Sequence, residues 1–171
     1  RKRDYPAGCC YQIPGYDLYK TFNDYYARLT YALTRGRAER RILLLHPQHS
    51  GWALYTPLDP SRAQQLDERW QNLTAMLLQT QRDYDLGEEL ILERHARVED
   101  GEFVVGDMRY RAVVVPPAET WCASTLALLE DFAAQGGLVI AVKPTARYLD
   151  GRESPQLAAF WADPAVVHVR R

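Results

Sequence analysis

The chain has 171 residues, of which 47% are apolar and 25% are charged, and its formal net charge is −1. This is ordinary globular composition, and a nearly neutral chain offers no field that would favour nucleic acid or an anionic membrane. No apolar run approaches the ~20 residues that a membrane-spanning helix needs. We therefore expect one globular domain whose partners include neither nucleic acid nor a membrane.

Residues 1–16 contain two prolines and two glycines and show little periodicity. This composition predicts an irregular lead-in that comes from a preceding domain, followed by a single α/β domain over 17–171. The chain starts Arg-Lys-Arg rather than with Met, so we expect a fragment of a longer polypeptide. Its three cysteines, Cys9, Cys10 and Cys122, are an odd number with two adjacent, which is not the pattern of a disulfide framework.

A helix is predicted from Asp17, a candidate cap, to Gly36, a candidate stop. Its apolar residues recur at spacings of three and four: Leu18, Phe22, Tyr25, Leu29 and Leu33. The continuous aliphatic run RILLL at 41–45 then predicts a strand covered on both faces, as in a parallel sheet.

The capping-box pattern of Ser61 and Gln64 predicts the start of a long helix. Strand and helix patterns then alternate to the end of the chain: strand 83–86, helix 88–93, hairpin 96–105 turning at Asp100–Gly101, strand 111–115, helix 124–135, strand 138–142, helix 155–162 and strand 165–169. This alternation predicts a layered α/β fold with a mostly parallel sheet, Rossmann-like or flavodoxin-like, and the hairpin as an addition.

Ligands of open α/β sheets bind beyond the carboxyl ends of the strands, which selects the loops 46–55, 86–89 and 116–121. None of these loops has a glycine-rich nucleotide or phosphate motif. A nucleophile elbow is also missing, because Pro116 and Pro117 follow the strand and Cys122 comes several residues late. We therefore predict no catalytic residue and no cofactor in this chain.

His46 and His49 are candidate metal ligands, but Pro47 separates them and no third ligand lies near in the sequence. Since zinc catalysis usually needs three protein ligands, we predict no metal. His46 can instead end the strand with a hydrogen bond to a loop, or the segment can form the polar rim of a ligand pocket. Trp52 and Tyr55 suit either core packing or stacking on a sugar.

Acidic residues gather around Gly87: Asp83, Asp85, Glu88 and Glu89. Paired carboxylates are the catalytic groups of glycoside hydrolysis. However, adjacent glutamates at a helix start point in different directions, and acids are favoured in a first turn by the helix dipole. The resulting candidate set for ligand binding, with no catalytic member, is His46, His49, Trp52, Tyr55, Glu88 and Glu89.

Six segments, taken in order, carry a family resemblance: KRDYP (2–6), FNDYYARLTYALTRG (22–36), ILLLHPQHSGWALYTPL (42–58), DYDLGEELIL (83–92), YRAVVVPP (110–117) and LLEDFAAQGGLVI (128–140). Together they resemble the internal α/β domain of large bacterial glycoside hydrolases of the α-L-rhamnosidase type, glycoside hydrolase family 106. That domain looks like the class I glutamine amidotransferase fold.

The resemblance implies that the catalytic carboxylates lie on a preceding (β/α)8 barrel of the same polypeptide, in the cytoplasm or periplasm of a bacterium. This chain would then be a non-catalytic accessory or oligomerisation domain that borders the sugar site, as a partner of the barrel or of a second copy. Two alternatives stay open, a carbohydrate-binding module and a degenerate amidotransferase-like enzyme. Exposed apolar surface at Tyr19 and Tyr26 favours the first interpretation, a pocket at Trp52 and Tyr55 the second, and an accessible Cys122 bonded to a histidine the third.

Overall fold

The computed structural model describes residue 11 and residues 14–169, and the chain divides into two compact units, Arg1–Glu39 and Arg40–Arg171. Cys9, Cys10 and most of the predicted lead-in lie outside the described residues, and the boundary predicted after residue 16 falls inside the first unit.

In the first unit, a 3-10 helix, η1 (Tyr16–Leu18), leads into α1 (Tyr19–Leu33). The predicted Asp17 cap is wrong: this residue lies inside η1, and neither helix start has a side-chain cap. Helix α1 buries none of its side chains. Its predicted apolar stripe is 39–75% exposed at Leu18, Phe22, Tyr25, Leu29 and Leu33.

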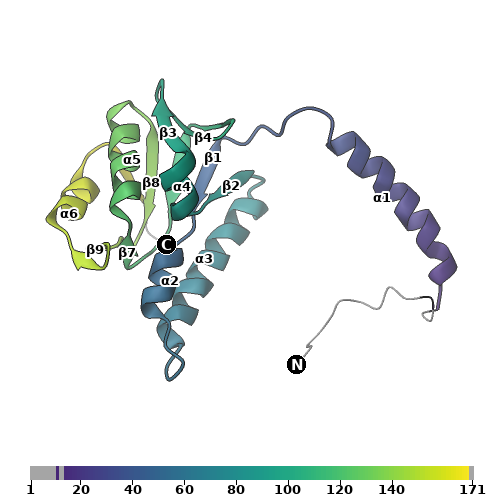
Figure 1. Ribbon diagram of the computed structural model, residues 1–171, viewed down its shortest axis with the longest axis horizontal. Coiled ribbons are helices and arrows are strands. Elements are labelled where there is room, and N and C mark those ends of the chain that lie inside the picture. The colour runs from purple at the N-terminus through teal and green to yellow at the C-terminus, as the bar shows by residue number, and fades with distance from the viewer. Residues whose placement is uncertain (1–10, 12–13, 170–171) are drawn as a thin grey trace. The chain divides into compact units, whose positions relative to one another are not determined.

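The second unit is built on a five-stranded parallel sheet (Figure 1). Its strands are β1 (Ile42–Leu45), β2 (Tyr84–Gly87), β6 (Ala112–Val115), β8 (Leu138–Val142) and β11 (Val166–Val169), and they stand in the order β11-β8-β6-β1-β2. The layered, mostly parallel α/β fold is therefore confirmed. The order of connection reverses between β1 and β6, which makes their carboxyl ends the topological switch point.

Five helices accompany this sheet: α2 (Gln48–Leu54), α3 (Ser61–Gln79), α4 (Glu89–His95), α5 (Ala123–Ala134) and α6 (Pro155–Ala162). Alternate strand residues face opposite layers. Leu43 and Leu45 pack in the cluster that α4, α5 and α6 share, whereas Leu44 packs with Leu73 of α3. The sheet is thus the middle layer between these helices.

Helix α2 was not predicted, because the segment after β1 was interpreted as a loop. The capping box predicted for α3 is also wrong. Ser61 is the first helical residue rather than the cap, and its N–H donates to Asp59 Oδ1 at 3.1 Å. Hydrogen bonding to Ser61, first through its side chain and then through its backbone N–H, holds the pKa of Asp59 below its usual value.

The hairpin of β3 (Ala96–Glu99) and β4 (Glu102–Val105) is confirmed. Its turn places Asp100 and Gly101 at φ 53° and 73°, the left-handed conformation that a tight hairpin turn requires. Two features were not predicted. Strand β5 (Met108–Tyr110) extends the hairpin to three strands, and a small sheet joins β7 (Thr120–Trp121), β9 (Tyr148–Leu149) and β10 (Arg152–Glu153).

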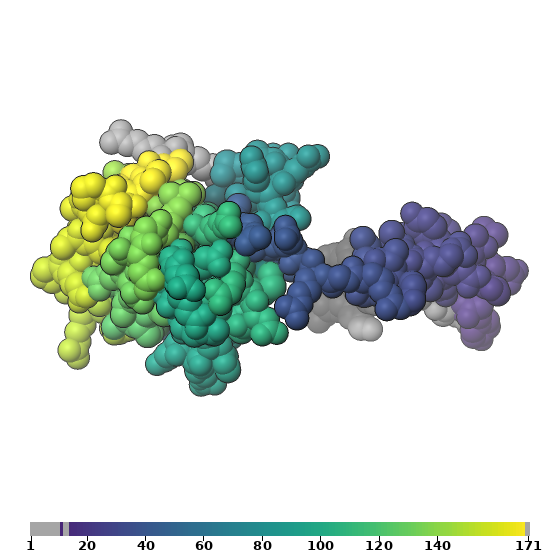
Figure 2. All heavy atoms as spheres, turned by 90° about the horizontal axis from the view of Figure 1, so that it is seen from above, coloured from purple at the N-terminus to yellow at the C-terminus, as the bar shows by residue number. Residues whose placement is uncertain are grey.

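Helix α5 contributes to the core the residues that the pattern placed inward, Leu126, Leu129 and Phe132. Each of them is at most 1% exposed. Figure 2 shows the C-terminal residues, in yellow, beside residues coloured green, in agreement with the pairing of β11 and β8. Strand β11 is less covered than the central strands, since Val167 and Val169 are 45% and 41% exposed. Among the described helices, none has the length and apolar character that crossing a membrane would require.

Candidate functional site

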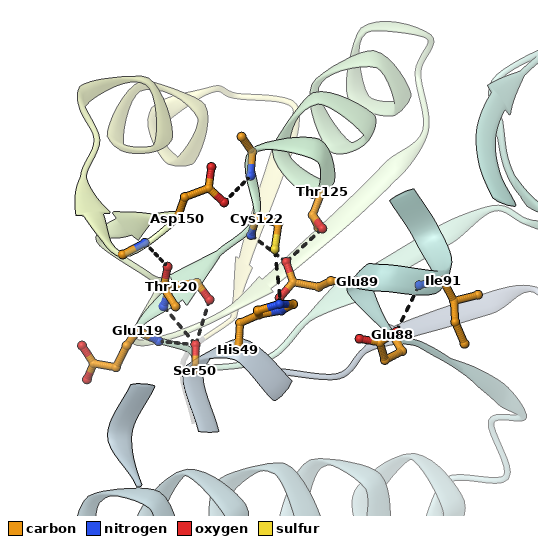
Figure 3. Close-up of polar contacts among 12 residues, drawn as sticks. His49, Ser50, Glu88, Glu89, Ile91, Glu119, Thr120, Cys122, Thr125 and Asp150 are labelled. Atoms are coloured by element: carbon orange, nitrogen blue, oxygen red, sulfur yellow. Dashed lines mark hydrogen bonds and ion pairs between the residues drawn. The ribbon is translucent and has the colours of Figure 1, made fainter. Parts of the chain in front are cut away.

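Three side chains meet at the switch point of the sheet (Figure 3). His49 lies in the first turn of α2, Glu89 is the first residue of α4, and Cys122 is the N-cap residue of α5. His49 and Glu89 follow β1 and β2, and Cys122 comes after β6 and the short strand β7. The carboxyl ends of β1, β2 and β6 were expected to carry the chemistry. The predicted residues His49 and Glu89 are therefore brought together, and Cys122 joins them although sequence reasoning had set it aside.

The Glu89 carboxylate is the centre of this cluster and has no exposed side-chain surface. Its Oε1 lies 2.8 Å from His49 Nδ1. Its Oε2 accepts hydrogen bonds from the Cys122 N–H at 2.7 Å and from the Thr125 hydroxyl at 2.9 Å. These contacts compensate the cost of burying a carboxylate and join α2, α4 and α5 at their N-terminal turns.

The Cys122 sulfur lies 3.6 Å from His49 Nδ1, the same nitrogen that faces Glu89. With Glu89 as a carboxylate, which only accepts hydrogen bonds, Nδ1 is the donor in this contact and is not free to deprotonate the thiol. Burial raises the pKa of Cys122 to about 12, and the negative charge of Glu89 and a hydrogen bond with it add to the increase. The half-buried thiol is thus held in its protonated, weakly nucleophilic form.

Ser50, which sequence reasoning did not select, is fully buried beside this cluster. Its hydroxyl donates to the Thr120 carbonyl at 2.8 Å and accepts from the backbone N–H groups of Glu119 and Thr120 at 3.0 and 2.9 Å. The only indication of this role in the sequence is a small polar residue directly before Gly51. Ser50 fastens α2 to β7, the strand that leads directly to Cys122.

The other acidic candidates have separate partners. Glu88 caps α4, its Oε2 accepting the Ile91 N–H at 3.0 Å, so the two adjacent glutamates do point in different directions as expected. Asp85 accepts hydrogen bonds from Arg40 at 2.8 Å and from the Tyr110 hydroxyl at 3.0 Å. Burial, with this carboxylate contact, raises the pKa of Tyr110. Asp85, Glu88 and Glu89 are thus each held by partners of their own within the protein.

A shallow hollow of about 210 Å³ lies next to the end of β1, and His46 and Trp52 line it. The rest of its lining consists of Pro47, Gln48, Gly51, Ala63, Leu66, Asp67 and Trp70. The rings of His46 and Trp70 pack edge to face, with their centroids 4.9 Å apart. The backbone N–H of His46 donates to the Gly87 carbonyl at 2.9 Å. Trp70 and Asp67 were missed because the pattern of α3 assigned them only to a helix.

The six predicted ligand-binding residues therefore separate into distinct environments. His46 and Trp52 border the hollow. The rings of His49 and Trp52 pack edge to face, with their centroids 5.0 Å apart. Tyr55 is 61% exposed and does not line the hollow. Glu89 belongs to the buried cluster and Glu88 to the α4 cap, so the six candidates do not all lie in one place.

The three side chains of the cluster also have the donor atoms of a metal site. The ligand atoms of His49, Glu89 and Cys122 lie within 4.8 Å of one another. Local spacing did not predict this arrangement, because 40 residues separate His49 from Glu89 and 33 separate Glu89 from Cys122.

Comparison with known proteins gives no further assignment. No family model matches the chain, and neither a curated protein nor a solved structure gives a significant match.

Proposed function

We propose that this chain is a non-catalytic accessory domain of a glycoside hydrolase and that the hollow beside β1 borders a sugar site. We further propose that its sheet is of the flavodoxin-like, class I glutamine amidotransferase-like type. Numbered along the chain, the five parallel strands stand in the order 2-1-3-4-5, which supports this type. The family resemblance of the segments around β1, β2 and β6 supports the enzyme class.

The hollow is the observation that carries the proposal. It combines aromatic surfaces of Trp52 and Trp70 with polar groups of Gln48 and Asp67. Aromatic faces suit the apolar face of a sugar ring, and amide and carboxylate groups suit its hydroxyls. Its 210 Å³ lies below the roughly 300–1,000 Å³ of sites for drug-sized ligands, so it suits a single sugar residue.

Internal hydrogen bonding supports a non-catalytic role. Glu89 is fully buried and its carboxylate is bonded to three neighbouring groups, while the Ser50 hydroxyl makes three hydrogen bonds to the backbone. Groups used in this way hold the helix N-termini together and are not directed at a substrate. A catalytic site elsewhere in the parent polypeptide is consistent with this arrangement.

The apolar side of α1, which is not covered within its own unit, supports a role in contact with another protein surface. Its apolar residues Phe22, Tyr25 and Tyr26 are 55–59% exposed, and Tyr19 is half-buried. We propose the preceding barrel of the same polypeptide as the surface that α1 contacts, with a second copy of the chain as the alternative.

A thiol-dependent enzyme is the second candidate, because Cys122 contacts His49 at 3.6 Å. A working thiol–imidazole pair needs a histidine nitrogen that is free to take the thiol proton, with the orienting acid on the other nitrogen. Here both Glu89 and Cys122 face Nδ1. The geometry therefore favours the accessory role.

Calorimetric titration of the full chain with L-rhamnose and other monosaccharides tests the proposal. We expect weak saturable binding of one sugar, reduced about five- to tenfold by Trp52→Ala, since stacking on one aromatic ring contributes about 1–1.5 kcal/mol. Tyr55→Ala is the matched control, an exposed aromatic three residues away that does not line the hollow. Absence of binding throughout the panel, or equal binding by the Trp52 variant, would overturn the proposal.

A further inference from the structure

We propose that His49 Nδ1, Glu89 Oε1 and Cys122 Sγ bind a divalent transition-metal ion, of which zinc fits best. The three side chains offer an imidazole nitrogen, a carboxylate oxygen and a sulfur, and one ligand atom from each lies within 4.8 Å of the other two. Each side chain comes from the start of a different helix of one packed unit, so the site is assembled by the tertiary fold.

The distance between the sulfur and the nitrogen fits a tetrahedral ion. With Zn–S near 2.3 Å and Zn–N near 2.0–2.1 Å, two such ligands at a tetrahedral angle stand roughly 3.6 Å apart. The Cys122 sulfur and His49 Nδ1 are 3.6 Å apart. A nitrogen and an oxygen ligand stand roughly 3.3 Å apart on the same ion, so the 2.8 Å contact between His49 and Glu89 must widen by about half an ångström.

The second oxygen of Glu89 orients the carboxylate for this role. Oε2 is held by the Cys122 N–H at 2.7 Å and the Thr125 hydroxyl at 2.9 Å, which leaves Oε1 directed at His49. Metal-binding carboxylates are typically fixed in this way by hydrogen bonds from neighbouring groups. The cluster therefore has both its ligands and the contacts that hold one of them in place.

The donor set selects the class of metal. Thiolate and imidazole favour zinc and cobalt over the hard ions magnesium and calcium, which prefer oxygen ligands. Three protein ligands leave a fourth position for water. His49 keeps 24% of its side chain exposed, which opens the cluster to solvent on that side, whereas Glu89 is fully enclosed.

Binding has a defined proton balance. The Cys122 sulfur forms its bond to the ion as a thiolate, and the thiol proton passes to solvent. The imidazole proton moves from Nδ1 to Nε2, so the ring stays neutral and Nδ1 donates its lone pair to the ion. One proton is released for each ion bound, and the affinity therefore rises with pH.

Cobalt(II) titration of the full chain tests this site, with Cys9→Ser and Cys10→Ser introduced to remove the other two thiols. We expect one cobalt per chain, a thiolate-to-cobalt absorption band, and displacement of cobalt by zinc. Cys122→Ser should abolish the band, and His49→Ala should weaken binding about tenfold or more. His95→Ala, at an exposed histidine outside the cluster, is the control and should change neither the band nor the affinity.

Absence of a band in the parent chain, or a band that survives Cys122→Ser, would overturn the metal site. Equal losses in the His49 and His95 variants would also overturn it. If Cys122→Ser fails to fold, as judged by circular dichroism, His49→Gln carries the same comparison. The sugar titration, performed with a chelator present, depends on the hollow and not on the cluster, so failure of one proposal leaves the other standing.

Discussion

Ser50 and Thr120 are 70 positions apart in the chain and exchange two hydrogen bonds in the fold. The Ser50 hydroxyl donates to the Thr120 carbonyl at 2.8 Å and accepts the Thr120 N–H at 2.9 Å. A third bond, from the Glu119 N–H at 3.0 Å, completes this contact. The pair sets the position of α2 against β7, and with it the distance between His49 and Cys122.

Ser50→Ala should lower the free energy of unfolding by about 2–3 kcal/mol, because it leaves buried backbone donors and an acceptor without a partner. Urea denaturation followed by circular dichroism measures this change. Ser124→Ala, a half-buried serine early in α5, is the matched control and should alter stability by less than about 0.5 kcal/mol. Equal effects of the two changes would contradict the role assigned to Ser50.

Glu89→Gln should be much more destabilising than Glu88→Gln, although the two residues are adjacent. The amide accepts on one side only, so it removes the charge that strengthens these hydrogen bonds and either leaves one partner unpaired or forces the His49 proton onto Nε2. We expect a loss of about 2–4 kcal/mol. At Glu88, glutamine still offers an oxygen to the Ile91 N–H, and we expect about 0.5 kcal/mol or less.

The same urea experiment compares the two glutamates directly. A Glu89 variant as stable as the Glu88 variant would show that the buried carboxylate does not hold α2, α4 and α5 together.

Two glycines should respond in opposite directions to alanine. A Cβ at Gly137 would overlap the ring of Phe132, which is fully buried and cannot move aside, so Gly137→Ala should cost about 1–3 kcal/mol. A Cβ at Gly51 meets nothing within 4 Å, and alanine is the better helix former, so Gly51→Ala should gain about 0.5–1 kcal/mol. Thermal unfolding of both variants checks the signs, and a stabilised Gly137 variant would contradict the packing of α5 on β8.

Cys122 should react slowly with iodoacetamide in the folded, chelator-treated chain. Burial and the Glu89 charge raise the pKa of its thiol from 9.0 to about 12, so little thiolate is present at pH 8. With Cys9→Ser and Cys10→Ser in place, we expect alkylation more than about tenfold slower than in the same chain unfolded in urea. Equal rates in the two states would contradict the protected thiol.

The same increase in pKa has a consequence for stability. Because folding raises the pKa of the Cys122 thiol, this group's contribution to the free energy of unfolding is complete below about pH 9, the pKa in the unfolded chain. The contribution is lost as the pH rises through about 12. Cys122→Ser should remove this part of the pH dependence at the alkaline end, as measured by urea denaturation between pH 8 and pH 10. An unchanged slope over that range would contradict the assignment.

The sheet could be predicted from the sequence because its central strands are continuous aliphatic runs that need cover on both faces. Strands β7, β9 and β10 have two residues each, too few to show a period. Helix α2 has seven residues with a central glycine, so its pattern resembled a loop. Short elements of this kind are fixed by tertiary contacts such as those of Ser50, which a local pattern does not contain.

The candidate site was predicted in part for the same reason. The rule that ligands bind at the carboxyl ends of strands selected the segments of His46, His49 and Glu89. Cys122 was set aside because it follows β6 too late for a nucleophile elbow. The chain between β6 and Cys122 forms β7, which returns the N-terminus of α5 to the switch point and places the sulfur beside His49. The aromatic lining from α3 likewise depends on how that helix packs on α2, and not on its own sequence period.

One NMR measurement tests the central claim most directly, that this domain contacts sugar without cleaving it. The full chain is titrated with an aryl α-L-rhamnoside while the indole signals of Trp52 and Trp70 and the anomeric signal of the sugar are recorded over time. The account predicts saturable shifts of these indole signals, with the glycoside recovered intact. Hydrolysis that Cys122→Ser or Glu89→Gln abolishes, or sugar binding that leaves both indole signals unmoved, would contradict it.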